Sequence, residues 1–246
     1  LSTGAVGFSD DRDTAFGGAG NDTVYGGSGN DIIHGCAGND VAYGWVGDDR
    51  FYGGDGMDFF DAGSGNDTLY GGNGADWLEG GKHADIAYGG EGDDVIYGGN
   101  DDSTNTAYGG AGDDLIDGGD GFDVLKGGND ADYLNGEGGN DLLYGGLGSD
   151  FIQGDEGDGN QASDLIDLGV DNNPDFARVG NGDEVRNFGR EDRLALGIGV
   201  LESIEFLPNG GITFVGDVSM RTVYGISQDS IFDALSDGRI TFDPVG

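Results

Sequence analysis

Residues 17–34 read GGAGNDTVY GGSGNDIIH, which is two copies of one nine-residue unit. The unit has the form G-G-x-G-x-D-x-U-x, where U is a large apolar residue. It starts at residues 17, 26, 35, 44, 53, 62, 71, 80, 89, 98, 109, 118, 127, 136 and 145, so its spacing changes once, by two residues, after residue 98. Acids at the sixth position and apolar residues at the eighth stay in phase over this length, which is typical of a stacked repeat architecture.

The pattern within each unit predicts a loop followed by a short strand. Glycine adopts positive φ without steric penalty and lets the carbonyls of a tight loop turn toward one point. In the x-U-x triplet the middle side chain points inward and its neighbours point outward. Two units then make one turn, and each strand pairs with the strand eighteen residues further on. We expect an all-β fold, a parallel β-roll (β-solenoid) with two nonapeptides per turn.

The sixth-position acids form a column of candidate Ca²⁺ ligands. Calcium takes six to eight oxygens from carboxylates and backbone carbonyls in flexible geometry. A loop of glycine carbonyls plus one Asp provides half of such a shell, and the loop one turn further on provides the other half. We expect Asp22 to share an ion with Asp40, and Asp31 with Asp49, which gives two rows of ions along the two edges of the roll.

The predicted ligands follow from the unit. The carboxylates are Asp22, Asp31, Asp40, Asp49, Asp58, Asp67, Asp76, Asp85, Asp94, Asp114, Asp123, Asp132, Asp141, Asp150 and Asp164. The carbonyls belong to second- and fourth-position glycines: Gly18, Gly20, Gly27, Gly29, Gly54, Gly56, Gly72, Gly74, Gly90, Gly92, Gly110, Gly112, Gly119, Gly121, Gly146 and Gly148. Asn105 takes the acid position after the slip. Because it offers a neutral oxygen, we expect a bulged loop at 98–108 with a weakened or missing ion.

From about residue 8 to residue 168 the chain resembles the RTX (repeats-in-toxin, hemolysin-type calcium-binding repeat) family. The resemblance implies a right-handed parallel β-roll and Ca²⁺-triggered folding outside the cell. It also implies export in the unfolded state by a type I secretion system, and therefore a bacterial protein that is secreted or displayed on the cell surface. Multiple Ca²⁺ ions, on the order of ten, would be bound.

The expected roll has a thin interior with one large apolar side chain per unit. Ordering a residue costs roughly 1–2 kcal/mol of backbone entropy, whereas burying one Leu or Ile returns only about 1.5–3 kcal/mol. Stacked aspartates would also repel one another. We therefore expect calcium to be required for folding, and the chain to be disordered without it.

Composition restricts the partners. The chain has 246 residues, 56 of them Gly, and a net charge of −38 with only 10 Lys and Arg, so we do not expect a nucleic-acid partner. No apolar run approaches the ~20 residues of a membrane span, and no secretory signal peptide is visible. The chain starts at Leu1, which suggests a processed or excised piece of a longer protein.

Several glycine positions carry other residues. Cys36, Trp45, Ala62, His83, Asp130 and Glu137 stand where the unit has glycine. We interpret Cys36 as a tolerated small residue rather than a reactive thiol. His tolerates left-handed backbone better than most residues, so His83 is a structural stand-in rather than a catalytic or metal-binding histidine.

Two outward files of side chains could contact a partner. One face carries His34, Tyr52, Tyr70, Tyr88, Tyr108, Lys126 and Tyr144, and the other carries Thr23, Val41, Phe59, Trp77, Val95, Leu115, Tyr133 and Phe151. Cross-strand pairing alone could explain both files, because aromatic and β-branched residues stabilise sheets. The alternative is a docking surface for saccharide rings, another domain or another copy of the roll, above all at the Phe59/Trp77 stripe.

The ends differ from the repeats. Residues 1–16 are expected to form an N-terminal edge with a degenerate repeat, residues 17–168 the calcium-binding roll, and residues 169–246 a β-rich C-terminal cap. Within the cap we expect a hairpin at 200–216, strands at 221–226 and 239–242, and a helical turn at 229–235. Residues 183–197 resemble the segment after the repeats in RTX proteases and lipases. Residues 217–246 could hold a type I secretion signal.

The chain shows no catalytic constellation. It contains neither H-E-x-x-H nor G-x-S-x-G, and its two histidines, His34 and His83, lie inside repeats. We therefore expect no enzyme activity in this chain. Two functions stay open: a structural or adhesive interaction module of a secreted or surface protein, or the non-catalytic C-terminal module of an RTX protease, lipase or alginate epimerase that aids export, folding and substrate contact.

Overall fold

The computed structural model describes residues 6–7, 12–154, 164–169 and 175–179, and the strands at 184–186, 193–197, 201–206, 212–216, 220–223 and 240–243. Every regular element in these segments is a β-strand. The described part accordingly has no helix of the length and apolarity needed to cross a membrane.

The strands form two sheets, and strands alternate between them along the chain. One sheet contains β1 (Val6–Gly7), β3 (Thr23–Ser28), β5 (Val41–Val46), β7 (Phe59–Ser64), β9 (Trp77–Lys82), β11 (Val95–Gly99), β13 (Leu115–Asp117), β15 (Tyr133–Asn135), β17 (Phe151–Gln153), β19 (Phe176–Val179), β21 (Arg193–Gly197) and β25 (Ile240–Asp243). The other contains β2 (Thr14–Ala19), β4 (Ile32–Ala37), β6 (Arg50–Asp55), β8 (Thr68–Asn73), β10 (Ile86–Glu91), β12 (Thr106–Ala111), β14 (Val124–Asn129), β16 (Leu142–Leu147), β18 (Leu165–Asp167), β20 (Glu184–Arg186), β24 (Met220–Val223), β23 (Ile212–Gly216) and β22 (Leu201–Phe206).

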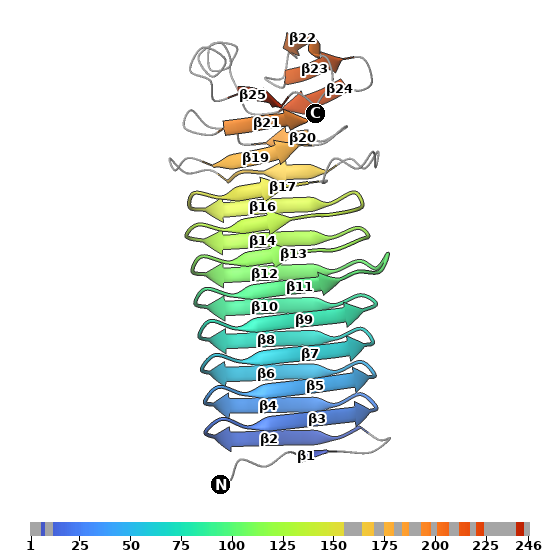
Figure 1. Cartoon of the computed structure of the whole chain (residues 1–246), viewed down its shortest axis with the longest axis vertical. Helices are drawn as coiled ribbons and strands as arrows, with labels where there is room; N and C mark the ends of the chain where they lie inside the picture. Colours follow the sequence, from blue (N-terminus) through green and yellow to red (C-terminus); the bar gives the residue numbers. More distant parts are fainter. Residues whose placement is uncertain are drawn as a thin grey trace.

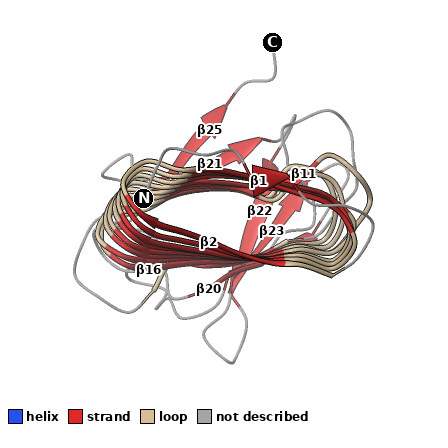
Figure 2. Cartoon of the chain, turned by 90° about the horizontal axis from the view of Figure 1, so that it is seen from below, coloured by secondary structure: helices blue, strands red, loops and turns tan. Residues whose placement is uncertain are grey.

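The two sheets are the walls of a flattened solenoid. Strands stack in chain order from β1 at one end toward the C-terminal strands at the other (Figure 1). Seen along the stack, two layers of strands face each other and loops close both edges (Figure 2). Neighbours pair in parallel with an offset of one turn, as in Thr23 with Val41 and Phe59 with Trp77. This register confirms the predicted roll of two nonapeptides per turn.

The two-residue slip lies in the loop between β11 and β12. Ile86 pairs with Thr68 on one side and with Thr106 on the other, so the offset grows from eighteen to twenty residues without a break in the ladder. The extra residues are therefore confined to the loop, as the sequence predicted.

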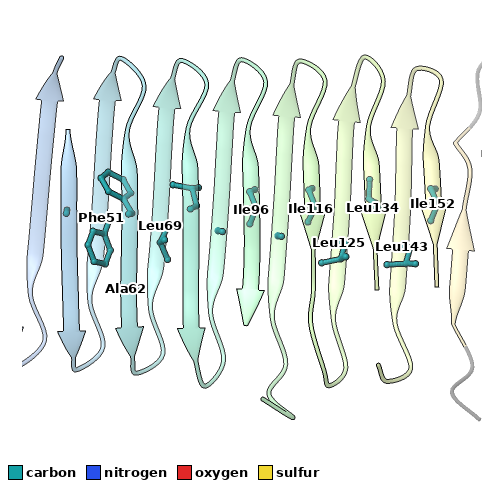
Figure 3. Packing of buried hydrophobic residues seen from close by; sticks show 14 of the residues in the cluster. Phe51, Ala62, Leu69, Ile96, Ile116, Leu125, Leu134, Leu143 and Ile152 are labelled. Carbon is teal, nitrogen blue, oxygen red and sulfur yellow. The ribbon is translucent and has the colours of Figure 1, made fainter. Parts of the chain in front are cut away.

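The eighth position of every regular unit fills the interior between the sheets. These side chains have relative exposures of 0–6%: Val24, Ile33, Ala42, Phe51, Phe60, Leu69, Leu78, Ala87, Ile96, Ala107, Ile116, Leu125, Leu134, Leu143 and Ile152. They form one continuous file along the stack (Figure 3). The two largest of these side chains, Phe51 and Phe60, have ring centroids 5.2 Å apart. Phe60 pairs with the small residue Ala42 on the neighbouring strand, and the small residue Ala62 follows Phe60 on its own strand. This file is the core that the repeat predicted.

Five of the non-glycine residues in glycine positions have positive φ: Cys36, Trp45, His83, Asp130 and Glu137. Their backbones therefore keep the loop conformation that glycine adopts elsewhere, which agrees with the structural interpretation of Cys36 and His83. Ala62 differs because it occupies the first position, where no positive φ is required.

The C-terminal segment continues the solenoid before it changes. Parallel strands β19, β20 and β21 extend both sheets beyond residue 168. The predicted hairpin at 200–216 is present as the antiparallel pair β22 and β23, and β24 adds to it. The predicted last strand is β25, which pairs in parallel with β21. The helical turn predicted at 229–235 lies outside the described residues, as does most of the N-terminal edge.

Candidate calcium sites

The sixth-position acids are buried inside the loops and linked into ladders. Their relative exposures lie between 0% and 5%. The backbone N–H of Asp22 donates to Oδ1 of Asp40 at 2.7 Å, and that of Asp31 donates to Oδ1 of Asp49 at 2.7 Å. The structure thus brings together the pairs that the sequence predicted to share an ion.

The ladders run along the two edges. One row joins Asp22, Asp40, Asp58, Asp76, Asp94, Asp114, Asp132, Asp150 and Asp175. The other joins Asp13, Asp31, Asp49, Asp67, Asp85, Asn105, Asp123, Asp141 and Asp164. Asp175 was not among the predicted ligands. It follows Asp150 by twenty-five residues and Asp164 by eleven, so neither spacing is a multiple of nine and a count of nines misses it.

The second carboxylate oxygen of most ladder acids has no hydrogen-bond donor. Oδ2 is buried and makes no hydrogen bond in Asp22, Asp31, Asp40, Asp49, Asp58, Asp67, Asp76, Asp85, Asp94, Asp114, Asp123 and Asp132. A buried polar atom without a partner costs roughly 1–3 kcal/mol, and more when the group is charged. A row of such atoms on one fold indicates a ligand that satisfies them, and for carboxylate oxygens that ligand is a cation.

For nine of these twelve aspartates, a first-position backbone carbonyl of the next turn lies near the same point as Oδ2. A Cβ atom built on Gly17 would lie 3.0 Å from Oδ2 of Asp22 and 2.9 Å from the carbonyl oxygen of Gly35. At Gly80 the corresponding distances are 2.6 Å to Oδ2 of Asp85 and 2.7 Å to the oxygen of Gly98. Two acceptors therefore border a space that a side chain would fill. The sequence prediction did not include this first-position carbonyl.

The predicted second- and fourth-position glycine carbonyls extend along the stack. A methyl group at Gly38 would meet the carbonyl oxygen of Gly20, and one at Gly72 would meet that of Gly54. Each loop thus presents carbonyls to the loop of the next turn. Their part in binding an ion stays a prediction.

Burial makes the ladder carboxylates hard to ionise without a cation. Desolvation, opposed by the backbone hydrogen bond and reinforced by neighbouring acids, raises the pKa of Asp85, Asp123 and Asp132 to about 8. The same causes raise the pKa of Asp49 to about 7, and that of Asp58 to about 6. A bound divalent cation would offset this penalty, because an opposite charge favours the ionised form.

The donor set fits calcium. The described residues hold no group of three or more His, Cys, Asp or Glu side chains placed to bind one metal ion. A cation here would therefore take much of its shell from backbone carbonyls. Oxygen-only, mostly uncharged shells with flexible geometry suit Ca²⁺, whereas zinc prefers nitrogen and sulfur.

A thin parallel solenoid with buried acid ladders at both edges defines a calcium-binding β-roll. The family model for the RTX calcium-binding nonapeptide repeat (4 copies) matches residues 9–42, 33–60, 52–86, 70–104, 103–125, 108–143, 126–161 and 138–173. The chain therefore belongs to the RTX calcium-binding repeat family. Its repeats bind Ca²⁺, and the roll that they form is a structural, non-catalytic module. No curated protein sequence is significantly similar to the chain.

Proposed function

We propose that this chain is a calcium-dependent folding and interaction module of a bacterial protein that is secreted by a type I system or displayed on the cell surface. The observation that carries the proposal is the row of buried Oδ2 atoms without hydrogen-bond partners. Ionised carboxylates in such a row are unfavourable without cations, so we expect the folded state to depend on the calcium around it.

Calcium concentration then separates two states of the chain. In a cytosol with little free Ca²⁺, sites of the extracellular kind, with dissociation constants of roughly 10⁻⁴–10⁻³ M, stay empty. The chain, with its net charge of −38, is unfolded there and can be threaded through a channel. Outside the cell, binding and folding occur as one event.

We place the contact with a partner at the Phe59/Trp77 stripe rather than on the tyrosine file. In that file Tyr52, Tyr70 and Tyr88 stack within 4° of parallel and with centroids 4.9–5.0 Å apart, so their faces cover one another. Saccharide rings and apolar partners use aromatic faces, and the tyrosines present only edges.

The rings of the stripe are less regularly stacked than those of the tyrosine file. Phe59 and Trp77 have centroids 6.3 Å apart at 30°, Trp77 and Tyr97 are tilted by 40°, and Trp77 is 41% exposed. Asp61 and Glu79 lie on the same face two residues beyond these rings and pair across the strands. Tilted rings beside carboxylates can stack against and accept hydrogen bonds from a hydroxyl-rich ligand, so a saccharide is the partner that this surface suits.

The test is a calcium titration from excess chelator to about 10 mM, a span that brackets extracellular sites. Far-UV circular dichroism would follow the strand content, and sedimentation velocity would follow compaction and self-association. A cooperative coil-to-β transition with compaction is expected. A chain already rich in β-structure in chelator would refute calcium as the folding trigger, and dimers or fibres at saturation would assign the stripe to self-association.

A further inference from the structure

Asn105 occupies an acid position in one ladder but makes a contact that no acid can make. It is 2% exposed, and its Oδ1 accepts the backbone N–H of Asp85 at 3.1 Å, as the Oδ1 of an acid does elsewhere. Its Nδ2 donates to the carbonyl oxygen of Gly118 at 3.2 Å. Both ends of the amide are therefore satisfied within the protein.

The orientation of this amide is determined by its partners. If the amide were rotated by half a turn, Nδ2 would face the N–H of Asp85 and Oδ1 would face the Gly118 carbonyl, which places like groups against each other. The hydrogen bond from Asp85 thus fixes the NH₂ group toward Gly118.

In the regular turns, the residue that corresponds to Gly118 has its carbonyl oxygen next to the space where we expect a cation. One turn earlier, the Gly98 oxygen and Oδ2 of Asp85 both face the point where a Cβ on Gly80 would lie. After the slip, the Gly118 oxygen also lies next to the Cβ position of Gly98, but the side-chain atom that meets it there is Nδ2 of Asn105, 2.8 Å from that position. A hydrogen-bond donor occupies the space that two acceptors border elsewhere.

We propose that Asn105 closes its turn with a hydrogen bond in place of a calcium ion, so that one of the two ion rows has a permanent gap. The proposal rests on the calcium sites proposed above, and it adds to the sequence prediction for 98–108 the contact that replaces the ion, the hydrogen bond from Asn105 to Gly118. The amide hydrogens point at the space where a cation would bind, and the position carries no negative charge. Both features prevent an ion from binding here, rather than merely lowering its affinity.

The inserted loop is completed by its own contacts. Oδ2 of Asp101 accepts the backbone N–H of His83 at 3.0 Å, and Oδ1 accepts that of Ser103 at 3.2 Å. The Ser103 carbonyl lies against Gly121, in the place that a fourth-position glycine carbonyl takes in regular turns. The side chains of Asn105 and Asp101 thus have hydrogen-bond partners within the protein without an ion. The proposed gap divides the row of ions on this edge into two segments.

Native mass spectrometry of the full chain at saturating Ca²⁺ tests the proposal, because it counts ions directly. Asn105→Asp restores the second acceptor and should bind one Ca²⁺ more than the wild-type chain. Asn66→Asp is the matched control: it adds the same charge in a loop of the same edge, but Asn66 is exposed and its Oδ1 accepts the N–H of Ala84. Its ion count should equal that of the wild type.

The reverse substitution keeps the test decisive if Asn105→Asp does not fold. The Cβ position of Gly26 is 2.7 Å from Oδ2 of Asp31 and 3.0 Å from the carbonyl oxygen of Gly44. Asp31→Asn therefore places an NH₂ group next to that carbonyl oxygen. It should bind one ion fewer than the wild type. Unchanged counts in the variants of a calcium-loaded chain overturn the inference alone, whereas a wild-type chain without bound Ca²⁺ overturns the proposed function and the inference together.

Discussion

The rings of Tyr70 and Tyr88 stack face to face, with centroids 4.9 Å apart and planes within 3°. Neighbouring strands in a sheet lie about 4.7–4.9 Å apart, so the parallel in-register ladder sets the ring spacing. The same stacking runs from Phe16 through His34 and Tyr52, and it reaches Tyr108. Lys126 then continues the file, with Nζ 5.1 Å from the ring centroid of Tyr108 and 5.4 Å from that of Tyr144.

Removing one ring should weaken the roll. Tyr70 stacks on Tyr52 and Tyr88, and an aromatic pair contributes about 0.5–1.5 kcal/mol beyond burial. Tyr70→Ala should therefore lower the free energy of unfolding by about 1–3 kcal/mol, measured by chemical denaturation in saturating Ca²⁺. Tyr70→Phe keeps the ring and should unfold like the wild type. Equal losses in both variants would assign the effect to the hydroxyl instead.

Loss of one ladder acid should raise the calcium requirement. Asp67 is fully buried, its Oδ1 accepts the N–H of Asp49 at 2.6 Å and its Oδ2 is without a partner. Asp67→Ala should shift the Ca²⁺ midpoint of folding, followed by circular dichroism, to higher concentration. Asp102→Ala removes an exposed acid from the inserted loop of the same edge and should leave the midpoint nearly unchanged. A similar shift in both variants would mean that only net charge matters.

The cost of a side chain at a fourth-position glycine should depend on whether the loop of the preceding turn packs against it. Gly74 has φ 135°, and a Cβ there would collide with the carbonyl of Gly56, whereas Gly20 has φ 102° and open space around it. Gly20→Ala meets only the left-handed backbone penalty, about 1–2 kcal/mol. Gly74→Ala should lower stability by clearly more, in thermal unfolding with Ca²⁺. Equal costs would show that neighbouring loops do not constrain this position.

Asp61 and Glu79, which lie beside the Phe59/Trp77 stripe, should make the stability of the roll pH-dependent. Desolvation raises the pKa of Asp61, and desolvation together with the charge of Asp61 raises the pKa of Glu79. A carboxyl with a raised pKa in the folded state stabilises the fold when protonated, and this contribution is lost as pH rises through the folded pKa. Asp61→Asn should therefore gain stability over the wild type at about pH 8, and less at about pH 5.

Thermal unfolding of both proteins at fixed, saturating Ca²⁺ would measure the difference. Protonation of the ladder acids affects the stability of the two proteins equally and cancels in the comparison. A gain that stays constant across the pH range would contradict the assignment to charge and indicate a change in packing.

The repeated features were predictable because each follows from a local rule applied many times. Alternation in x-U-x places Leu69 in the core and Tyr70 on the surface, and the nine-residue period fixes which strand pairs with which. The acid rows follow from the same count, so Asp67 and Asp85 were identified as neighbours without coordinates.

Other features depend on atoms that the repeat does not specify. The use of one Asp oxygen to accept a backbone N–H, which leaves Oδ2 for a ligand, requires the side-chain rotamer. The first-position carbonyl, such as that of Gly35, becomes a candidate ligand only when the loop direction is known. Asp175 lies after an insertion of arbitrary length, and only strand pairing returns it to its row.

The aspartate ladder has one consequence for the roll as a polymer. Every N–H donor at this position reaches forward to the next turn, as Asp76 does to Asp94 and Asp94 does to Asp114. A roll divided between two turns would thus have dissimilar cut surfaces, with amide donors on the N-terminal half and carboxylate acceptors on the C-terminal half. The aspartate ladder can therefore continue across the joint only when the two halves meet head to tail. Two identical cut surfaces placed against each other would bring donors against donors or acceptors against acceptors.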